Sequence, residues 1–296
     1  ALRETHRMKL WSLDTIESVH GVSIGGILSV ILLLGYDWDV LDDYFIKRPW
    51  EQLVNITPEL VFAAFAQKGI FGEQLFENVL DPLFTAKDLS VDITFGEFFD
   101  ITGKNLVLYS HNINDMDFRL TAFSHTTHPN MRLITAVHMT CAIPIAFTPV
   151  FYNDGCYIDG GVVANIPVNH SIDIVSEMNQ SKRGDDVSTS VDPSFKQFNE
   201  FLVFRNLPRE KMEMETISPE TSTFLTYVNH IIFKLVRFVN RDQEQTIVPN
   251  TIWCDVSRVG RIQDWLGIIS SKKRRRRLIR SGVESVVRFY KNQNGK

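Results

Sequence analysis

The segment GVSIG at residues 21–25 matches the G-x-S-x-G pattern, in which a serine sits on a sharp turn between a strand and a helix. Residues 15–20, before the turn, are predicted to form a strand, and the apolar residues 24–34, after it, a buried helix. In such a turn the Ser23 hydroxyl stands exposed at the carboxyl edge of the sheet. The backbone N–H of Ile24, at the helix N-terminus, can then stabilise an oxyanion.

The two glycines of this pattern, Gly21 and Gly25, would let neighbouring backbone approach the serine closely. Glycine and serine are frequent residues, so the five-residue pattern has a second interpretation. It is equally compatible with a Gly/Ser turn that caps a buried helix and has no chemical role.

The rest of the chain alternates between strand and helix patterns. Strands are predicted at residues 105–109, 117–123, 157–158, 201–204 and 251–256. Helices are predicted at residues 1–10, 131–140 and from 272 onward, with more helical patterns between 37 and 101. This order predicts an α/β protein with a mostly parallel central sheet and helices on both faces. We expect one domain, made of a core at residues 1–175, a polar surface loop at 176–198, and C-terminal strands and helices at 199–296 that complete it.

Composition excludes several classes of protein. The chain has 296 residues, of which 44% are hydrophobic and 22% charged, and its net charge is −4. These values exclude disordered, collagen-like and coiled-coil chains, and the negative charge gives no global field that would favour nucleic acid. Three cysteines at no metal-like spacing argue against a disulfide framework or a zinc site and favour a cytoplasmic protein. No segment reaches the ~18–20 apolar residues that a membrane-spanning helix needs.

A second motif, Asp159-Gly160-Gly161, follows the predicted strand at residues 157–158. The glycines permit a tight turn there, and the Asp159 carboxylate could take a serine proton directly, without an imidazole. The alternative is an ordinary Asp-Gly turn that closes a hairpin. A base other than Asp159 is also conceivable, because an α/β-hydrolase triad has the chain order Ser, Asp, His, and either His170 or His230 could complete it.

Taken together, the motifs resemble those of the patatin-like phospholipases, lipid acyl hydrolases that use a Ser–Asp dyad. The family's G-x-S-x-G corresponds to residues 21–25 and its D-G-G/A to residues 159–161, and residues 140–150 resemble its small-x-Ala-x-Pro-x-x-Phe run. The resemblance implies a three-layer α/β/α fold, with Ser23 and Asp159 as the dyad and the Ile24 amide at the oxyanion. It implies a lipid or phospholipid substrate and no metal or organic cofactor.

One feature of the family is not found in this sequence. Patatin-like enzymes carry a glycine-rich loop, one helix ahead of the serine, whose N–H groups serve the oxyanion, and that place falls just upstream of Ala1. Loss of one oxyanion donor costs roughly 10²–10³ in rate in a well-studied serine protease. The alternative to an active lipid hydrolase is therefore a catalytically weak or inactive patatin-like protein with a binding or regulatory role.

Two C-terminal features suit peripheral contact with a membrane. Residues 224–239 carry an apolar stripe at helical spacing, and residues 272–277 are six consecutive basic residues. Each basic side chain near an anionic surface contributes about 1 kcal/mol of attraction. The alternatives are that the stripe belongs to the core and that the basic run is a solvated helix surface.

Overall fold

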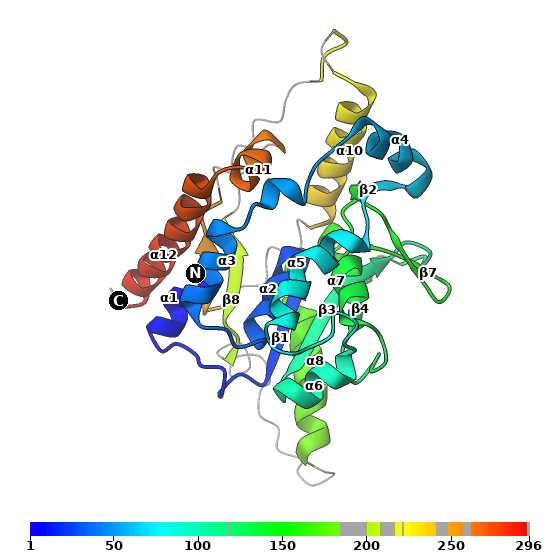
Figure 1. Ribbon diagram of the computed structural model, residues 1–296. Coiled ribbons are helices and arrows are strands. Elements are labelled where there is room, and N and C mark those ends of the chain that lie inside the picture. Colours follow the sequence, from blue (N-terminus) through cyan, green and yellow to red (C-terminus); the bar gives the residue numbers. More distant parts are fainter. Residues whose placement is uncertain are drawn as a thin grey trace.

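The computed structural model describes residues 1–117, 119–183, 200–207, 217–220, 222–240, 248–256 and 262–294 (Figure 1). The helices are α1 (Leu2–Arg7), α2 (Ile24–Leu33), α3 (Trp38–Lys47), α4 (Pro58–Gln67), α5 (Glu73–Thr85), α6 (Phe95–Thr102), α7 (Leu133–Cys141), α8 (Val168–Arg183), α10 (Phe224–Val239), α11 (Ile262–Ile269) and α12 (Lys272–Asn294). The strands are β1 (Ser18–Val22), β2 (Gly69–Phe71), β3 (Asn105–Asn112), β4 (Thr121–Phe123), β5 (Ile145–Phe147), β6 (Val150–Tyr152), β7 (Gly155–Asp159), β8 (Val203–Asn206) and β9 (Thr251–Cys254).

The central sheet has five strands in the order β1-β3-β7-β6, with β4 also paired to β3. Strand β1 runs parallel to β3, whereas β4 and β7 pair with β3, and β6 with β7, in the antiparallel sense. Two further pairs, β2–β5 and β8–β9, are parallel and form separate two-stranded sheets. The parallel pair β1–β3 thus holds the strand of the serine turn, and β4, β7 and β6 extend this sheet in the antiparallel sense.

Strand β3 lies at the centre of the fold and is buried on both faces. Leu106 and Leu108 pack into the main core, together with side chains of α2, α5, α6 and α7. Val107 and Tyr109 point to the opposite face, where Ile174 of α8 covers them. Because successive side chains of a strand point to opposite faces, this alternation requires a layer of helices on each side. The predicted three-layer α/β/α class is confirmed.

Local sequence signals set several helix ends. Thr94 and Glu97 form a reciprocal capping box at the start of α6, and the Thr57 side chain caps α4, whose first residue is Pro58. The structure differs from the sequence prediction at residues 176–183. The sequence predicts a surface loop there, but these residues continue α8 as a helix, because apolar side chains such as Ile174 hold α8 on the sheet. Residues 184–198 of the predicted loop lie outside the described residues.

Candidate active site

Ser23 occupies the turn between β1 and α2. Its backbone has φ 55° and ψ −130°, a combination that residues with a side chain rarely adopt. A conformation of this kind costs of order 1–3 kcal/mol and persists only where the surroundings impose it. Ser23 is the N-cap residue of α2, yet its side chain makes no capping hydrogen bond. The hydroxyl is therefore available for another partner.

Close packing around the turn explains one of the two predicted glycines. A Cβ atom at Gly21 would lie 2.6 Å from the Gly26 Cα, and a Cβ atom at Gly26 would lie 2.8 Å from the Thr140 Cγ2. A Cβ atom at Gly25, by contrast, would meet nothing within 4 Å. The turn therefore needs glycine at positions 21 and 26. The expectation that Gly25 permits a close approach is wrong, because Gly25 faces open space.

The end of helix α7 holds the serine turn in place. The Ser23 N–H donates to the carbonyl oxygen of Thr140 at 3.1 Å and to its Oγ1 at 2.9 Å. The Thr140 hydroxyl donates in turn to the carbonyl oxygen of Tyr109 on β3 at 2.6 Å. Thr140 begins the stretch at residues 140–150 that resembles the family's run, but the sequence alone does not indicate its role. Its contact with Ser23 depends on the packing of α7 against β1 and β3.

Asp159 ends β7 and is only 2% exposed. Its Oδ1 accepts a hydrogen bond of 2.7 Å from the Gly161 N–H, and the Ser23 side chain lies close enough to the carboxyl group to lower its pKa. Burial raises the pKa of Asp159 from 3.8 to about 6, and the Ser23 side chain and the Gly161 N–H, which favour the ionised form, oppose that rise. The structure thus brings together the two side chains that the motifs singled out.

The register of β3 explains why Ser23 and Asp159 meet. Val22, the last residue of β1, pairs with Tyr109, and Asp159 pairs with the next residue, Ser110. Both chain ends therefore reach the same level of β3, from its parallel and its antiparallel neighbour. Gly160 makes the following turn possible, because a Cβ atom there would lie 2.6 Å from the Tyr109 carbonyl oxygen.

The Ile24 N–H lies in the first turn of α2, where backbone N–H groups have no partner within the helix. The side chain of Ile24 is 56% exposed, so this helix N-terminus opens to the surface. The dipole of the helix favours negative charge at that end. A ligand oxygen that reaches the Ser23 hydroxyl can therefore approach this donor.

Two of the histidines, His20 and His170, lie beside Tyr109 of β3, and His230 lies on α10. His20, which precedes the turn, is hydrogen-bonded to the Tyr109 hydroxyl at 2.8 Å, and burial lowers its pKa to about 4. The His170 ring lies beside Tyr109, 6.4 Å between ring centroids. In the described part of the chain, the groups that lower the pKa of Asp159 are the Ser23 side chain and the Gly161 N–H, and no histidine is among them.

Comparison with known proteins bears on the same region. The sequence model of a family described as "Patatin-like phospholipase" matches residues 7–172, more than half of the chain. The chain belongs to the patatin-like phospholipase family. The resemblance inferred from the motifs is confirmed.

Viral proteins are among the relatives. The chain is 28% identical over 172 residues to a "Probable lipid hydrolase 463L" of Invertebrate iridescent virus 6, covering 57% of this chain and 58% of that protein. It is 24% identical over 155 residues to an "Uncharacterized protein R571" of Acanthamoeba polyphaga mimivirus, covering 52% and 50%. The matches thus span about half the length of these relatives. The crystal structure of VipD from Legionella pneumophila aligns with a TM-score of 0.44 and 15% identity, over 97% of this chain and 63% of VipD.

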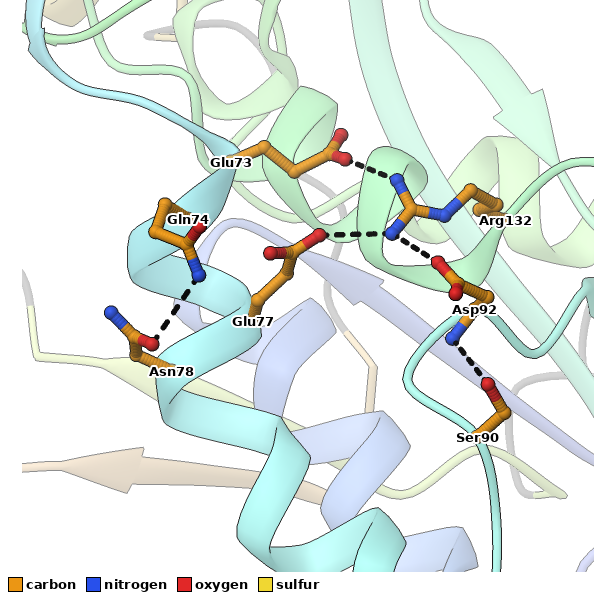
Figure 2. A network of polar contacts seen from close by, with 7 residues as sticks. All are labelled: Glu73, Gln74, Glu77, Asn78, Ser90, Asp92 and Arg132. Atoms are coloured by element: carbon orange, nitrogen blue, oxygen red, sulfur yellow. Dashed lines mark hydrogen bonds and ion pairs between the residues drawn. The ribbon is translucent and has the colours of Figure 1, made fainter.

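In this patatin-like protein an ion-pair network fixes the other end of α7 (Figure 2). Arg132, the N-cap residue of α7, contacts Glu73 and Glu77 of α5 and Asp92 of the following loop. The distances to Glu77 and Asp92 are 2.9 Å and 2.6 Å. Figure 2 shows the three carboxylates converging on one guanidinium group. Because α7 also contacts Ser23 through Thr140, this network helps to fix the helix that holds the serine turn.

The apolar stripe of α10 is at the surface. Its exposed side chains, which we call the α10 apolar face, are Phe224, Tyr227, Ile231, Leu235 and Phe238. The first and last are 75% and 72% exposed. The alternative that this stripe belongs to the core is therefore wrong for these residues. On α4, Phe62 and Phe65 are also exposed, at 77% and 73%, and in Figure 1 both helices lie toward the upper part of the view.

The basic run at residues 272–277 is only partly free to contact a surface. Arg275 is buried and donates hydrogen bonds to the carbonyl oxygens of Ile46 and Arg48 at the end of α3, and of Ile268 and Ile269 at the end of α11. Its charge thus serves two helix C-termini. The other five basic side chains are exposed. In the described ranges, no helix has both the length and the apolar character of a membrane span, and no group of His, Cys, Asp and Glu is placed to hold a metal ion.

Proposed function

We propose that this protein hydrolyses carboxylic ester bonds of lipids, with Ser23 as the nucleophile and Asp159 as the base. The observation that carries the proposal is that the Ser23 side chain, at a backbone turn with φ 55°, lies close enough to the buried Asp159 carboxyl group to lower its pKa. A serine hydroxyl is a weak nucleophile until a neighbouring base accepts its proton. Asp159 is the titratable group in that position.

The pKa of Asp159 suits this role. A value of about 6 leaves the carboxyl group ionised at pH 7, yet makes it a stronger base than an aspartate with the ordinary value of 3.8. Catalytic bases work best when their pKa lies near the working pH. Burial at the end of β7 therefore tunes Asp159 toward proton transfer.

The reaction has two steps. In the first, the Ser23 Oγ attacks the acyl carbonyl carbon while Asp159 takes its proton, and the Ile24 N–H donates to the oxyanion. Asp159 then gives the proton to the leaving alcohol oxygen as the ester C–O bond breaks, which leaves an acyl-enzyme. In the second, water attacks the acyl group with Asp159 again as base, and the proton returns to Ser23 as the fatty acid leaves.

A lipid substrate requires access from an aggregate or a membrane, and we propose that the α10 apolar face contacts that surface. The residues recur at intervals of three and four, so they form one stripe along the helix. Helix α10 is joined to the turn after Asp159 by hydrogen bonds from Asn240. The stripe thus lies on an element in direct contact with the active-site turn. The five exposed basic residues of 272–277 would add attraction to anionic headgroups.

A serine-reactive fluorophosphonate probe tests the chemistry. We expect the full-length protein to be labelled and to hydrolyse a short-chain ester, and we expect Ser23→Ala to abolish both. Asp159→Asn should slow labelling by at least about 10²-fold, since general base catalysis contributes 10²–10⁴. A folded protein without labelling or hydrolysis would favour the alternative, a patatin-like binding or regulatory protein.

Vesicle sedimentation tests the surface. Replacing Phe224 and Phe238 together by serine should lower binding to phosphatidylcholine vesicles by roughly 10-fold or more, because each side chain buries about 1.5–3 kcal/mol of transfer free energy. Met116→Ser is the matched control, because this side chain is 98% exposed but lies in the turn between β3 and β4. Equal loss of binding in both variants would contradict the assignment of this face.

A further inference from the structure

Asn240 forms the C-cap of α10 and is a buried polar residue, 8% exposed. Its Nδ2 donates to the carbonyl oxygens of Gly161 at 3.0 Å, Val162 at 3.3 Å and Val236 at 2.9 Å. Its Oδ1 accepts from the Asn165 N–H at 2.6 Å. Three of these four partners belong to the segment that directly follows Asp159.

Gly161 connects Asn240 to the Asp159 carboxyl group. The N–H of Gly161 donates to the Asp159 Oδ1 at 2.7 Å, and its carbonyl oxygen accepts from Asn240. A Cβ atom at Gly161 would lie 3.0 Å from the same Oδ1, so backbone and carboxyl group are in close contact. An amide that fixes the Gly161 carbonyl therefore also fixes the direction of the N–H that reaches Asp159.

An asparagine side chain suits this place because of its chemistry. Two backbone carbonyls after Asp159 need donors and one N–H needs an acceptor, and an unpaired buried group costs about 1–3 kcal/mol. A carboxamide supplies both functions from one side chain, whereas a carboxylate only accepts. Asn240 thus forms hydrogen bonds with the carbonyl oxygens of Gly161 and Val162 and with the N–H of Asn165, which the sheet and α8 do not pair.

We propose that Asn240 is a positioning residue that holds Gly161, and through it the Asp159 carboxyl group, in the geometry needed to take the Ser23 proton. This inference rests on the proposed function. It also identifies α10 as the element that carries both the exposed apolar face and the support of the active-site turn. The residue lies far from Asp159 in the sequence and outside the stretch that matches the family.

The test compares two ends of the same helix. Asn240→Ala removes the contacts with the turn, and Thr223→Ala removes the cap at the other end of α10, where the Thr223 hydroxyl accepts from the Thr226 N–H at 3.2 Å. We expect Asn240→Ala to lower kcat on a monomeric short-chain ester by about 10- to 100-fold, because small misplacements of catalytic groups cost that much. Thr223→Ala should change kcat less than about 3-fold, because the turn keeps its contacts. Equal losses in the two variants would overturn the proposal.

A second readout does not depend on turnover. Carboxyl ¹³C NMR titration should show a higher pKa for Asp159 in Asn240→Ala than in the unchanged protein, because the Gly161 N–H no longer holds the ionised form as well. Thr223→Ala should leave that pKa unchanged. Asn240→Asp keeps the acceptor for the Asn165 N–H, loses the N–H donors to the turn and adds a negative charge. It should therefore raise the pKa of Asp159 further. This variant replaces Asn240→Ala if the alanine variant fails to fold.

Failure of the proposed function and failure of the positioning role give different results. If the unchanged protein neither labels with fluorophosphonate nor hydrolyses esters, the proposed function fails, and the NMR titration still decides whether Asn240 sets the state of Asp159. If the unchanged protein is active while Asn240→Ala and Thr223→Ala give the same kcat and the same Asp159 pKa, the positioning role alone is refuted.

Discussion

Replacing Asp159 by asparagine should make the protein more stable at neutral pH. In the folded protein burial raises the pKa of Asp159 from 3.8 to about 6. Between these two values the folded state binds a proton that the unfolded chain has released, so the free energy of unfolding falls as the pH rises through this window. Above pH 6 the buried, ionised carboxylate lowers the free energy of unfolding by its full amount, roughly 3 kcal/mol.

The asparagine side chain removes that cost without changing the size of the group. It can still accept from the Gly161 N–H and can donate to the Ser23 Oγ. At pH 7.5 we expect Asp159→Asn to raise the free energy of unfolding by about 2–3 kcal/mol. Near pH 4 the wild-type carboxyl group is protonated in the folded state, so the gain should shrink below about 1 kcal/mol.

Urea unfolding at pH 4.0, 5.0, 6.0 and 7.5 measures this difference. Asp117→Asn is the matched control, because Asp117 is 64% exposed, pairs with the exposed Arg119, and should change stability little at every pH. A gain in Asp159→Asn of the same size at pH 4.0 and 7.5, or a loss at pH 7.5, would refute the reasoning. If Asp159→Asn is more stable and also loses activity, the buried carboxylate lowers the stability of the protein but is required for its function.

Three further substitutions, compared with two control variants, test the packing of the protein. Gly21→Ala should lower the free energy of unfolding by roughly 2–4 kcal/mol, because its Cβ atom meets backbone, whereas Gly25→Ala should be neutral or add up to about 1 kcal/mol through helix propensity. Thermal unfolding that ranks them in the opposite order would contradict the assigned geometry. Arg132→Gln should cost about 1–3 kcal/mol, since three carboxylates lose their shared cation, and the exposed Arg119→Gln less than about 0.5 kcal/mol. Arg275→Gln should cost roughly 2–4 kcal/mol in urea unfolding, because the C-termini of α3 and α11 lose charged donors. Equal effects of Arg275→Gln and Arg119→Gln would exclude that role.

Local backbone chemistry was readable from the sequence. The pattern at residues 21–25 predicted a strand, a sharp turn and a helix, and the structure has β1, the strained Ser23 and α2. The Asp-Gly-Gly motif likewise predicted a strand end followed by a tight turn, found at β7 and residues 160–162. These features depend on a few adjacent residues and their allowed dihedral angles, so they are encoded locally.

Burial and partners came only with the tertiary structure. Thr140 and Asn240 gave no local signal, because their roles depend on carbonyl and N–H groups of segments distant in sequence. The same holds for Arg275, which lies in a basic run but is buried at two helix ends, and for the α10 apolar face, whose period indicates one helix side without saying whether it is covered. Periodicity specifies which residues share a face, whereas the packing of distant elements determines what that face meets.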